Sequence, residues 1–232
     1  MKIYKLPNLI VVLSLILAGA GSFAYGDIEE QPAPRIERWE QTIRDFEALD
    51  KKTPAPKGEV LLIGGSNARR WTDVDDHFPK HRITNRGFGG ARLTEILHFV
   101  DRIVLPYEPK IILVNAGGND LNAGSSPKQV RQTAKSLIEA IRDKLPDSRI
   151  YFIGLPYVGR SYGRPEAQGM IDSFNSQLAD LAEQEAKVGF INILPAFLGE
   201  EGAFQKDLFV EDGTHFSPKG YAILAELIGD RL

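Results

Sequence analysis

The sequence predicts an α/β protein, a three-layer α/β/α sandwich around a central, mostly parallel sheet of five strands. Short runs of apolar, branched residues alternate along the chain with amphipathic stretches of ten or more residues. This alternation indicates βαβ units, because parallel neighbours need a long crossover connection. The expected strands cover residues 60–63, 82–85, 110–115, 149–155 and 189–193, and the expected helices cover residues 35–51, 91–104, 126–145, 166–187 and 217–232.

Residues 1–24 have the pattern of a secretory signal peptide. Lys2 and Lys5 precede an apolar run from residue 9 to residue 20, and small residues follow at Ser22 and Ala24. Cleavage after Ala24 predicts a secreted or periplasmic protein with no stable membrane span. The apolar run is shorter than the roughly 18 to 20 residues of a spanning helix, which disfavours the alternative, a retained N-terminal membrane anchor.

Composition narrows the class of the mature protein. Cleavage removes Lys2 and Lys5 and no acid, which leaves 26 basic and 31 acidic residues and a net charge of −5. This balance argues against a nucleic-acid partner, since such proteins are usually basic. The absence of cysteine excludes disulfides, a thioether lipid anchor and a thiolate nucleophile. We expect a polar leader and an amphipathic helix over residues 25–56 and one domain over residues 57–232.

A candidate nucleophile follows the first strand. Four apolar residues from Val60 lead into Gly64 and Gly65, and Ser66 comes next. The two glycines allow a sharp turn, which places Ser66 at the carboxyl end of a buried strand. In an open parallel sheet, ligands and catalytic groups collect at that edge. Taken alone, Ser66 is equally well interpreted as the N-cap of a helix.

Three further stretches end at the same predicted edge. A glycine-rich turn containing Gly90 follows the second strand, and its backbone N–H groups can approach a ligand closely. Asn119 follows the third strand and carries a side-chain donor. Asp212 and His215 precede the last helix, three residues apart, which lets a carboxylate orient an imidazole. Each stretch is by itself also compatible with an ordinary turn.

Taken together, these four blocks resemble those of the SGNH hydrolases, also called the GDSL esterase/lipase family. The resemblance covers nearly the whole mature chain and implies the flavodoxin-like fold of that family. It implies that Ser66 is the nucleophile, His215 the base and Asp212 the acid of a catalytic triad. It also implies an oxyanion hole formed by the Ser66 and Gly90 backbone N–H groups and the Asn119 side chain.

Two positions depart from the family pattern. Gly65 stands where the family usually has Asp before the serine, and Ala91 stands where many members have Asp in the second block. Neither departure removes a catalytic group. The resemblance implies a secreted serine esterase that acts on small acyl groups, including O-acetyl groups on carbohydrate, through an acyl-enzyme. An acyltransferase with the same triad and a non-catalytic carbohydrate-binding protein are the alternatives.

No cofactor or metal is expected. His77 and His81 are four residues apart, but Pro79 between them breaks the helix that would align them. The glycine-rich turns match neither a dinucleotide-binding nor a phosphate-binding loop. Three arginines near the proposed site, Arg69, Arg70 and Arg86, are expected in solvated or ion-paired structural roles.

The loop after Leu155 is expected to line the substrate pocket. It should run along the same edge of the sheet as the catalytic blocks, and it carries two tyrosines and two arginines, namely Tyr157, Arg160, Tyr162 and Arg164. An ordinary exposed loop is the equal alternative. No long apolar lid is present in the sequence, which favours an open site for a small acyl group. The substrate-binding residues and the oligomeric state stay open.

Overall fold

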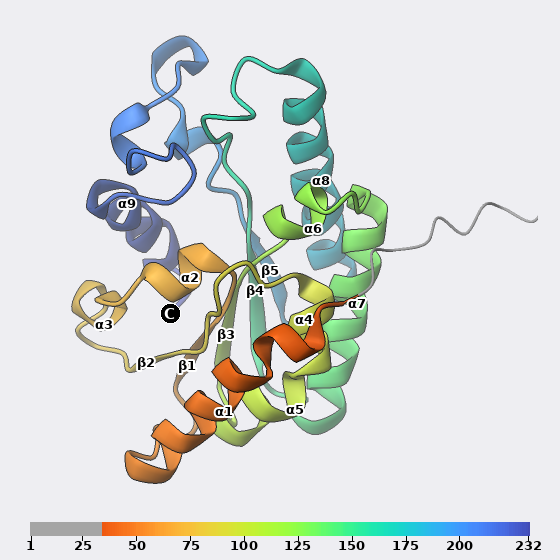
Figure 1. Ribbon diagram of the computed structural model, residues 1–232, viewed down its shortest axis with the longest axis vertical. Coiled ribbons are helices and arrows are strands. Elements are labelled where there is room, and N and C mark those ends of the chain that lie inside the picture. The colour runs from red at the N-terminus through yellow and green to blue at the C-terminus, as the bar shows by residue number, and fades with distance from the viewer. Residues whose placement is uncertain (1–33) are drawn as a thin grey trace, which may run out of the picture. The chain divides into compact units, whose positions relative to one another are not determined.

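Five parallel strands form one sheet in the order β2–β1–β3–β4–β5 (Figure 1). The computed structural model describes residues 34–232, so the predicted signal peptide lies outside the described residues. The strands are β1 (Val60–Gly64), β2 (Ile83–Asn85), β3 (Ile111–Asn115), β4 (Arg149–Ile153) and β5 (Val188–Ile191). The predicted five-stranded α/β sheet is confirmed, and all of its neighbouring strands are parallel.

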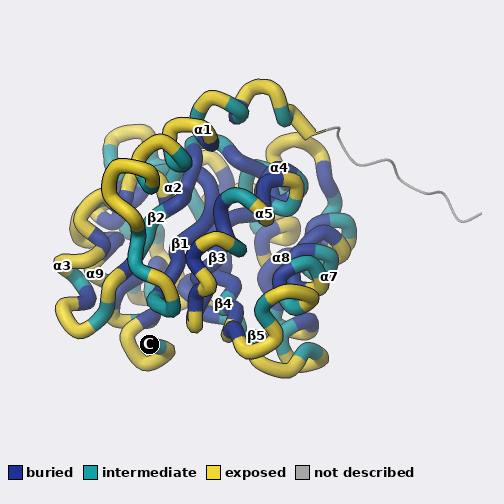
Figure 2. Tube along the Cα trace, turned by 90° about the horizontal axis from the view of Figure 1, so that it is seen from below, coloured by how far each residue is buried: buried dark blue, intermediate teal, exposed yellow. Residues whose placement is uncertain are grey.

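Helices cover both faces of the sheet (Figures 1 and 2). Buried residues of α1 (Ile36–Lys52), α4 (Leu93–His98), α5 (Val100–Ile103), α7 (Pro127–Lys144) and α8 (Pro165–Gln184) belong to one hydrophobic cluster. Buried residues of α2 (Ser66–Arg70), α3 (Val74–His77) and α9 (Pro218–Gly229) belong to the cluster on the other face. Another short helix, α6 (Gly118–Asn122), follows β3, and 3-10 turns lie at η1 (Leu105–Tyr107), η2 (Pro195–Phe197), η3 (Glu200–Gly202) and η4 (Lys206–Leu208).

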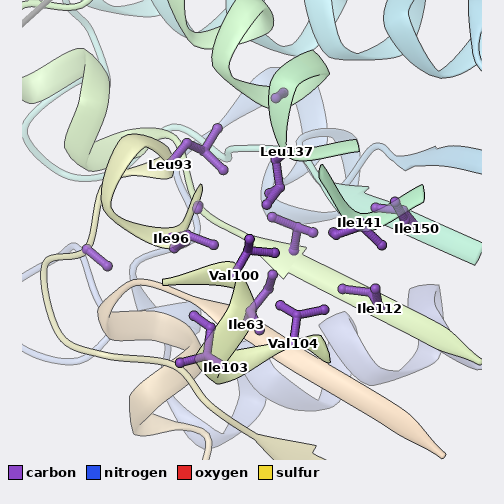
Figure 3. Packing of buried hydrophobic residues seen from close by; sticks show 14 of the residues in the cluster. Ile63, Leu93, Ile96, Val100, Ile103, Val104, Ile112, Leu137, Ile141 and Ile150 are labelled. Atoms are coloured by element: carbon purple, nitrogen blue, oxygen red, sulfur yellow. The ribbon is translucent and has the colours of Figure 1, made fainter. Parts of the chain in front are cut away.

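The two central strands explain why both faces are apolar. Their side chains alternate between the clusters, as the period of two in a strand requires. Leu61 and Ile63 of β1 contribute to the cluster with α7, which Figure 3 shows around Ile63 and Ile112. Val60 and Leu62 contribute to the cluster with α9. A strand buried on both faces is therefore a continuous apolar run in the sequence.

The chain changes direction across the sheet at β1. It leaves β1 for β2 on one side and then crosses to β3 on the other, with Gly64 opposite Asn115 in register. The loops after β1 and β3 therefore begin side by side. Ligand sites of open α/β sheets lie at such a switch point, outside the carboxyl ends of the strands.

Several helix boundaries differ from the sequence-based prediction. The helix expected over residues 91–104 is divided into α4 and α5 at Phe99, whose φ of −94° and ψ of 8° leave the helical range while its ring is buried. The last two long helices end earlier than expected, at Gln184 and Gly229. Ser126 and Ser217 cap α7 and α9 by accepting backbone N–H bonds, which agrees with the expected starts.

Candidate active site

Ser66 lies directly after a turn that only glycine fits. Gly64 has a φ of +153°, and a β-carbon there would lie 2.1 Å from the Asn115 carbonyl oxygen. The Gly65 N–H donates to that same carbonyl at 3.0 Å, which ties the turn to the end of β3. Ser66 is then the first residue of α2 and is half-buried. The close approach of two strand ends thus places the serine at the carboxyl edge.

The structure brings three predicted residues into one hydrogen-bonded chain. His215 Nε2 lies 2.9 Å from Ser66 Oγ, and His215 Nδ1 lies 2.5 Å from Asp212 Oδ2. The other Asp212 oxygen accepts the backbone N–H groups of Thr214 and His215, each at 2.9 Å. The His215 side chain, followed by its backbone N–H, holds the pKa of Asp212 well below its usual range. Asp212 is therefore an anion that fixes one imidazole nitrogen and leaves the other facing the serine.

Asn67 links the serine to the histidine turn and was missed in the sequence. Its Oδ1 accepts the Phe216 N–H at 3.2 Å, and its carbonyl accepts the Tyr221 hydroxyl at 2.8 Å. These contacts join residues 149 and 154 positions apart, so no local pattern reports them. They hold the Asp212–His215 turn against the start of α2.

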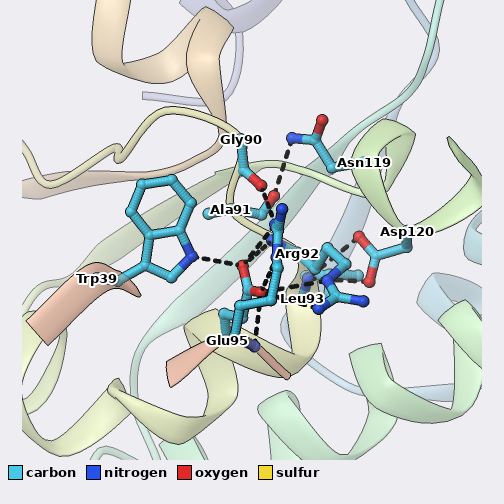
Figure 4. A network of polar contacts seen from close by, with 9 residues as sticks. Trp39, Gly90, Ala91, Arg92, Leu93, Glu95, Asn119 and Asp120 are labelled. Carbon is cyan, nitrogen blue, oxygen red and sulfur yellow. Dashed lines mark hydrogen bonds and ion pairs between the residues drawn. The ribbon is translucent and has the colours of Figure 1, made fainter. Parts of the chain in front are cut away.

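The predicted oxyanion donors gather beside Gly65. Asn119 Nδ2 donates to the Ala91 carbonyl at 3.0 Å, which places its amide next to the loop that contains Gly90 (Figure 4). A β-carbon on Gly65 would lie 2.9 Å from Asn119 Nδ2 and 3.5 Å from the Ala91 oxygen. Within residues 34–232, no acceptor is bound to the Ser66 or Gly90 backbone N–H. The Asn119 amide therefore lies beside the turn that carries Ser66, and Gly90 precedes the Ala91 carbonyl that this amide contacts.

This geometry also explains what replaces the two expected aspartates. The Asn119 amide occupies the space that a side chain at position 65 would need, so glycine is the residue that leaves Asn119 in place. Ala91 is fully buried and supports Asn119 through its carbonyl rather than through its side chain. The loop that contains Gly90 and Ala91 is held by two other acids, Glu95 and Asp120.

Glu95 is the first of these acids and is fully buried. It accepts bonds from Arg35 Nε at 2.9 Å, Trp39 Nε1 at 2.8 Å and the Arg92 N–H at 3.0 Å (Figure 4). Burial alone would raise the pKa of Glu95, but these hydrogen bonds outweigh it and lower the pKa to about 2. Arg35 also donates to the Gly90 carbonyl at 2.7 Å, which connects Glu95 to the loop that contains Gly90.

Asp120 is the second acid and follows Asn119 in the chain. It is 2% exposed, and both of its carboxylate oxygens lie 3.1 Å from the Leu93 N–H. Burial raises the pKa of Asp120 to about 7, although the Leu93 bond and the charge of Arg92 oppose the shift. Neither Glu95 nor Asp120 was predicted from the sequence to support the site. The position of Asp120 next to Asn119 is a signal that could have pointed to it. Glu95 gives no such signal, because its partners Arg35 and Trp39 are far away in the sequence.

A cavity of about 330 Å³ opens beside Ser66. Apolar side chains from α6, the loop after β4 and α8 form much of its lining, among them Leu121, Leu155, Val158 and Ile171. The loop after Leu155 contributes to the lining of this cavity, with Arg160 and Arg164 among the lining residues. Its tyrosines serve elsewhere, because Tyr157 donates to Asp172 at 2.6 Å and Tyr162 packs near Phe204.

The remaining charged candidates take structural or exposed positions. Arg86 is buried and pairs with Asp50 and the Tyr107 hydroxyl, whereas Arg69 and Arg70 are exposed. Residues 34–232 contain no cluster of three side chains suited to hold a metal ion. In this same part of the chain, no helix is both long and apolar enough to cross a membrane.

Comparison with known proteins identifies a family. The model of the GDSL-like lipase/acylhydrolase family matches residues 57–223. Thioesterase 1/protease 1/lysophospholipase L1 of Escherichia coli K12 is 23% identical over 153 residues, which cover 66% of this chain and 68% of that protein. A match to Mediator of RNA polymerase II transcription subunit 12 of Neurospora crassa is 24% identical over 177 residues but spans 9% of that protein.

Solved structures share the fold. A GDSL-like lipase from Bacteroides thetaiotaomicron has a TM-score of 0.66 at 20% identity and covers 85% of this chain and 96% of its own. A catalytic mutant of an acetylxylan esterase from Geobacillus stearothermophilus has a TM-score of 0.62 at 17% identity and covers 75% and 94%. At these identities the likeness concerns the fold, and the chemistry has to be argued from the site itself.

Proposed function

Because this chain belongs to the GDSL-like lipase/acylhydrolase family, we propose that it is a serine esterase that hydrolyses carboxylic esters with small acyl groups. The observation that carries the proposal is the hydrogen-bonded chain from Asp212 through His215 to Ser66, with contacts of 2.5 and 2.9 Å. A hydroxyl needs an adjacent base to act as a nucleophile, and that base needs a third group to hold it.

Acylation begins when Ser66 Oγ attacks the ester carbonyl. His215 Nε2 removes the hydroxyl proton as the new C–O bond forms, and Asp212 stabilises the resulting imidazolium. The tetrahedral intermediate collapses, the bond to the alcohol breaks, and His215 returns the proton to the leaving oxygen. Water then attacks the acyl-enzyme in the same way, which releases the acid and restores Ser66.

The negative charge of the intermediate is met by the donors beside Gly65. The free Ser66 and Gly90 N–H groups and the Asn119 amide are the groups that would bind the oxyanion. Each such donor contributes roughly 3 to 4 kcal/mol of transition-state stabilisation. Because Arg35 and Glu95 fix the Gly90 loop before any substrate arrives, little reorganisation is needed during the reaction.

The substrate class is inferred from the size of the cavity and from a structural neighbour. A volume of about 330 Å³ is large enough for a short acyl group or one sugar unit. One neighbour of the same fold is an acetylxylan esterase. We therefore propose O-acetyl groups on carbohydrate as the substrate. The signal peptide predicted from the sequence supports a secreted or periplasmic activity.

The test is hydrolysis of p-nitrophenyl esters from acetate to octanoate, with Ser66→Ala alongside. We expect the highest kcat/KM for acetate and a loss of at least about 10³-fold in the variant, because Ser66 is the nucleophile. A fluorophosphonate probe should label wild type at Ser66 and leave Ser66→Ala unlabelled. Equal labelling of both proteins, or full activity without Ser66, would reject the mechanism.

A further inference from the structure

The charged side chains that line the cavity beside Ser66 are all positive. Among the described residues that line it, only Arg160 and Arg164 carry a charge, and no carboxylate faces them from the lining. Both side chains are exposed, although the whole sequence has a net charge of −3. The mouth of this cavity is therefore locally positive on an acidic protein.

Neither arginine is used to hold the fold. Within residues 34–232, no ion pair or side-chain hydrogen bond reaches the Arg160 or Arg164 guanidinium. Other arginines pair with carboxylates, as Arg35 and Arg92 do with Glu95. The nearest acid along the chain is Glu166, an exposed residue in the first turn of α8 that is not part of the cavity lining and, within the described residues, pairs with neither arginine. Asp172 accepts the Tyr157 hydroxyl and Asp212 holds His215. Two guanidinium groups thus remain available at the cavity.

The loop that carries them is fixed to the catalytic turn. The Gly159 N–H donates to the Gly213 carbonyl at 2.7 Å, which places Arg160 next to the turn between Asp212 and His215. Ser161 Oγ bonds both polar atoms of the Val158 backbone, and the Arg164 N–H donates to the Ser161 carbonyl at 3.1 Å. Arg164 then leads into α8, a helix of 20 residues whose N-terminal dipole adds positive potential.

We propose that this cavity selects esters that carry an anionic group, which Arg160 and Arg164 bind while the ester carbonyl lies at Ser66. Guanidinium groups bind carboxylates through paired N–H donors, which suits an acid fixed at a set distance from the reacting carbonyl. The inference rests on the esterase proposed above and adds a substrate class, namely esters with a carboxylate on either the alcohol or the acyl part.

The first test compares matched neutral and anionic esters. Charge on the alcohol is tested with an O-acetylated methyl glucuronoside, whose carboxylate is free, against the O-acetylated methyl glucoside. Charge on the acyl group is tested with mono-p-nitrophenyl adipate against p-nitrophenyl hexanoate. We expect an anionic-to-neutral ratio of kcat/KM of about ten in one pair, since two exposed charge contacts add up to that factor. The ester pair that shows this ratio tells whether the bound carboxylate belongs to the alcohol or to the acyl part of the substrate.

The variants assign that ratio to the two arginines. The double substitution of Arg160→Gln and Arg164→Gln should reduce the ratio to about one, and Lys at both positions should retain part of it. Arg149→Gln is the matched control, because Arg149 is an exposed arginine at the opposite end of β4. The ratio of this control should equal that of wild type. Added salt should lower the wild-type ratio, because exposed charges are screened.

A binding measurement separates this inference from the proposed function. Ser66→Ala is titrated with methyl glucuronoside, adipate and their neutral counterparts, with and without the double arginine substitution. The anionic site is supported if Ser66→Ala binds an acid more tightly than its neutral counterpart and the double arginine substitution abolishes this difference. This result would hold even if no ester is hydrolysed. Equal affinity for acids and neutral ligands, or a wild-type ratio of one in both ester pairs, overturns it.

Discussion

The two halves of the site are held in opposite ways. On the acid–base side, Asp212 is exposed and bonds residues two and three positions away. On the side of Gly90 and Asn119, the long-range contacts join residues 27 to 60 positions apart, and two of the groups that make them, Glu95 and Asp120, are buried acids. The Asp212–His215 pair is formed by a local turn that Asn67 holds against α2, whereas the second half depends on the buried core.

Because of this difference, substitutions in the two halves should affect turnover and the free energy of unfolding to different extents. A change in the exposed turn alters chemistry but removes little buried structure. A change in Glu95 or Asp120 alters buried charges that many groups share, so it affects the free energy of unfolding as well as the oxyanion loop. Substitutions in the two halves should therefore have different signatures, and the predictions below run from the largest expected effect on turnover to the smallest.

Asp212→Asn should have the largest effect on turnover. The asparagine oxygen can still accept the Thr214 and His215 N–H groups, but its amide would face His215 Nδ1 and stabilise the wrong tautomer. We expect kcat to fall roughly 10³- to 10⁴-fold with little change in melting temperature. Glu211→Gln, an equal charge change at the exposed neighbouring residue, is the control. A large loss of stability in Asp212→Asn would contradict a purely local role.

Asn119→Ala should come next. Loss of one oxyanion donor lowers kcat by about 10²- to 10³-fold, with KM nearly unchanged because the donor acts in the transition state. Asn122→Ala is the matched control, since Asn122 lies one turn further along α6 and lines the same cavity. Its effect on kcat should be far smaller. Near-normal activity of Asn119→Ala would remove Asn119 from the oxyanion hole.

The sequence was informative where the structure is local. The strands are apolar runs because both sheet faces are buried, and Asp212 and His215 lie close together because three residues separate them. The fold class and the Asp212–His215 pair could therefore be predicted from the residues, whereas the contact of His215 with Ser66, 149 positions away, was predicted only from the family resemblance. The role of Glu95 could not be predicted, because its partners Arg35 and Trp39 are 60 and 56 residues away and no sequence pattern links positions that far apart. The break in the helix at Phe99 also depends on tertiary packing.

Glu95→Gln tests the buried half. It removes the buried charge with which Arg35 and Arg92 both pair. Breaking a buried pair in this way costs about 3 to 5 kcal/mol of unfolding free energy. The looser Gly90 loop should also lower kcat, by less than in Asn119→Ala because all three oxyanion donors remain.

The control for Glu95 is Glu47→Gln. Glu47 pairs with Arg102 at 2.6 Å, but its side chain is 38% exposed. An exposed pair of this kind contributes less than about 1 kcal/mol. Denaturant unfolding of both variants gives the comparison directly. Equal losses of stability would mean that the Glu95 network supports the site no more than a surface ion pair does.

Asp120→Asn should have the smallest effect on turnover, and it should change how the free energy of unfolding depends on pH. Burial raises its pKa from 3.8 to about 7 in the folded protein. Between these values the folded chain keeps a proton that the unfolded chain releases, so stability falls as pH rises, by at most about 1.4 kcal/mol per pH unit. Above pH 7 both states are ionised and this slope disappears. Asp120→Asn cannot titrate and removes it at every pH.

The measurement is the unfolding free energy of wild type and Asp120→Asn at pH 5, 6, 7 and 8. The wild-type curve should lose stability relative to the variant up to about pH 7 and then run parallel to it. Glu95, with its pKa near 2, stays ionised throughout and adds no slope in this range. Parallel curves from pH 5 upward would mean that Asp120 is already charged there, and that Arg92 and the Leu93 N–H outweigh burial in holding the oxyanion loop.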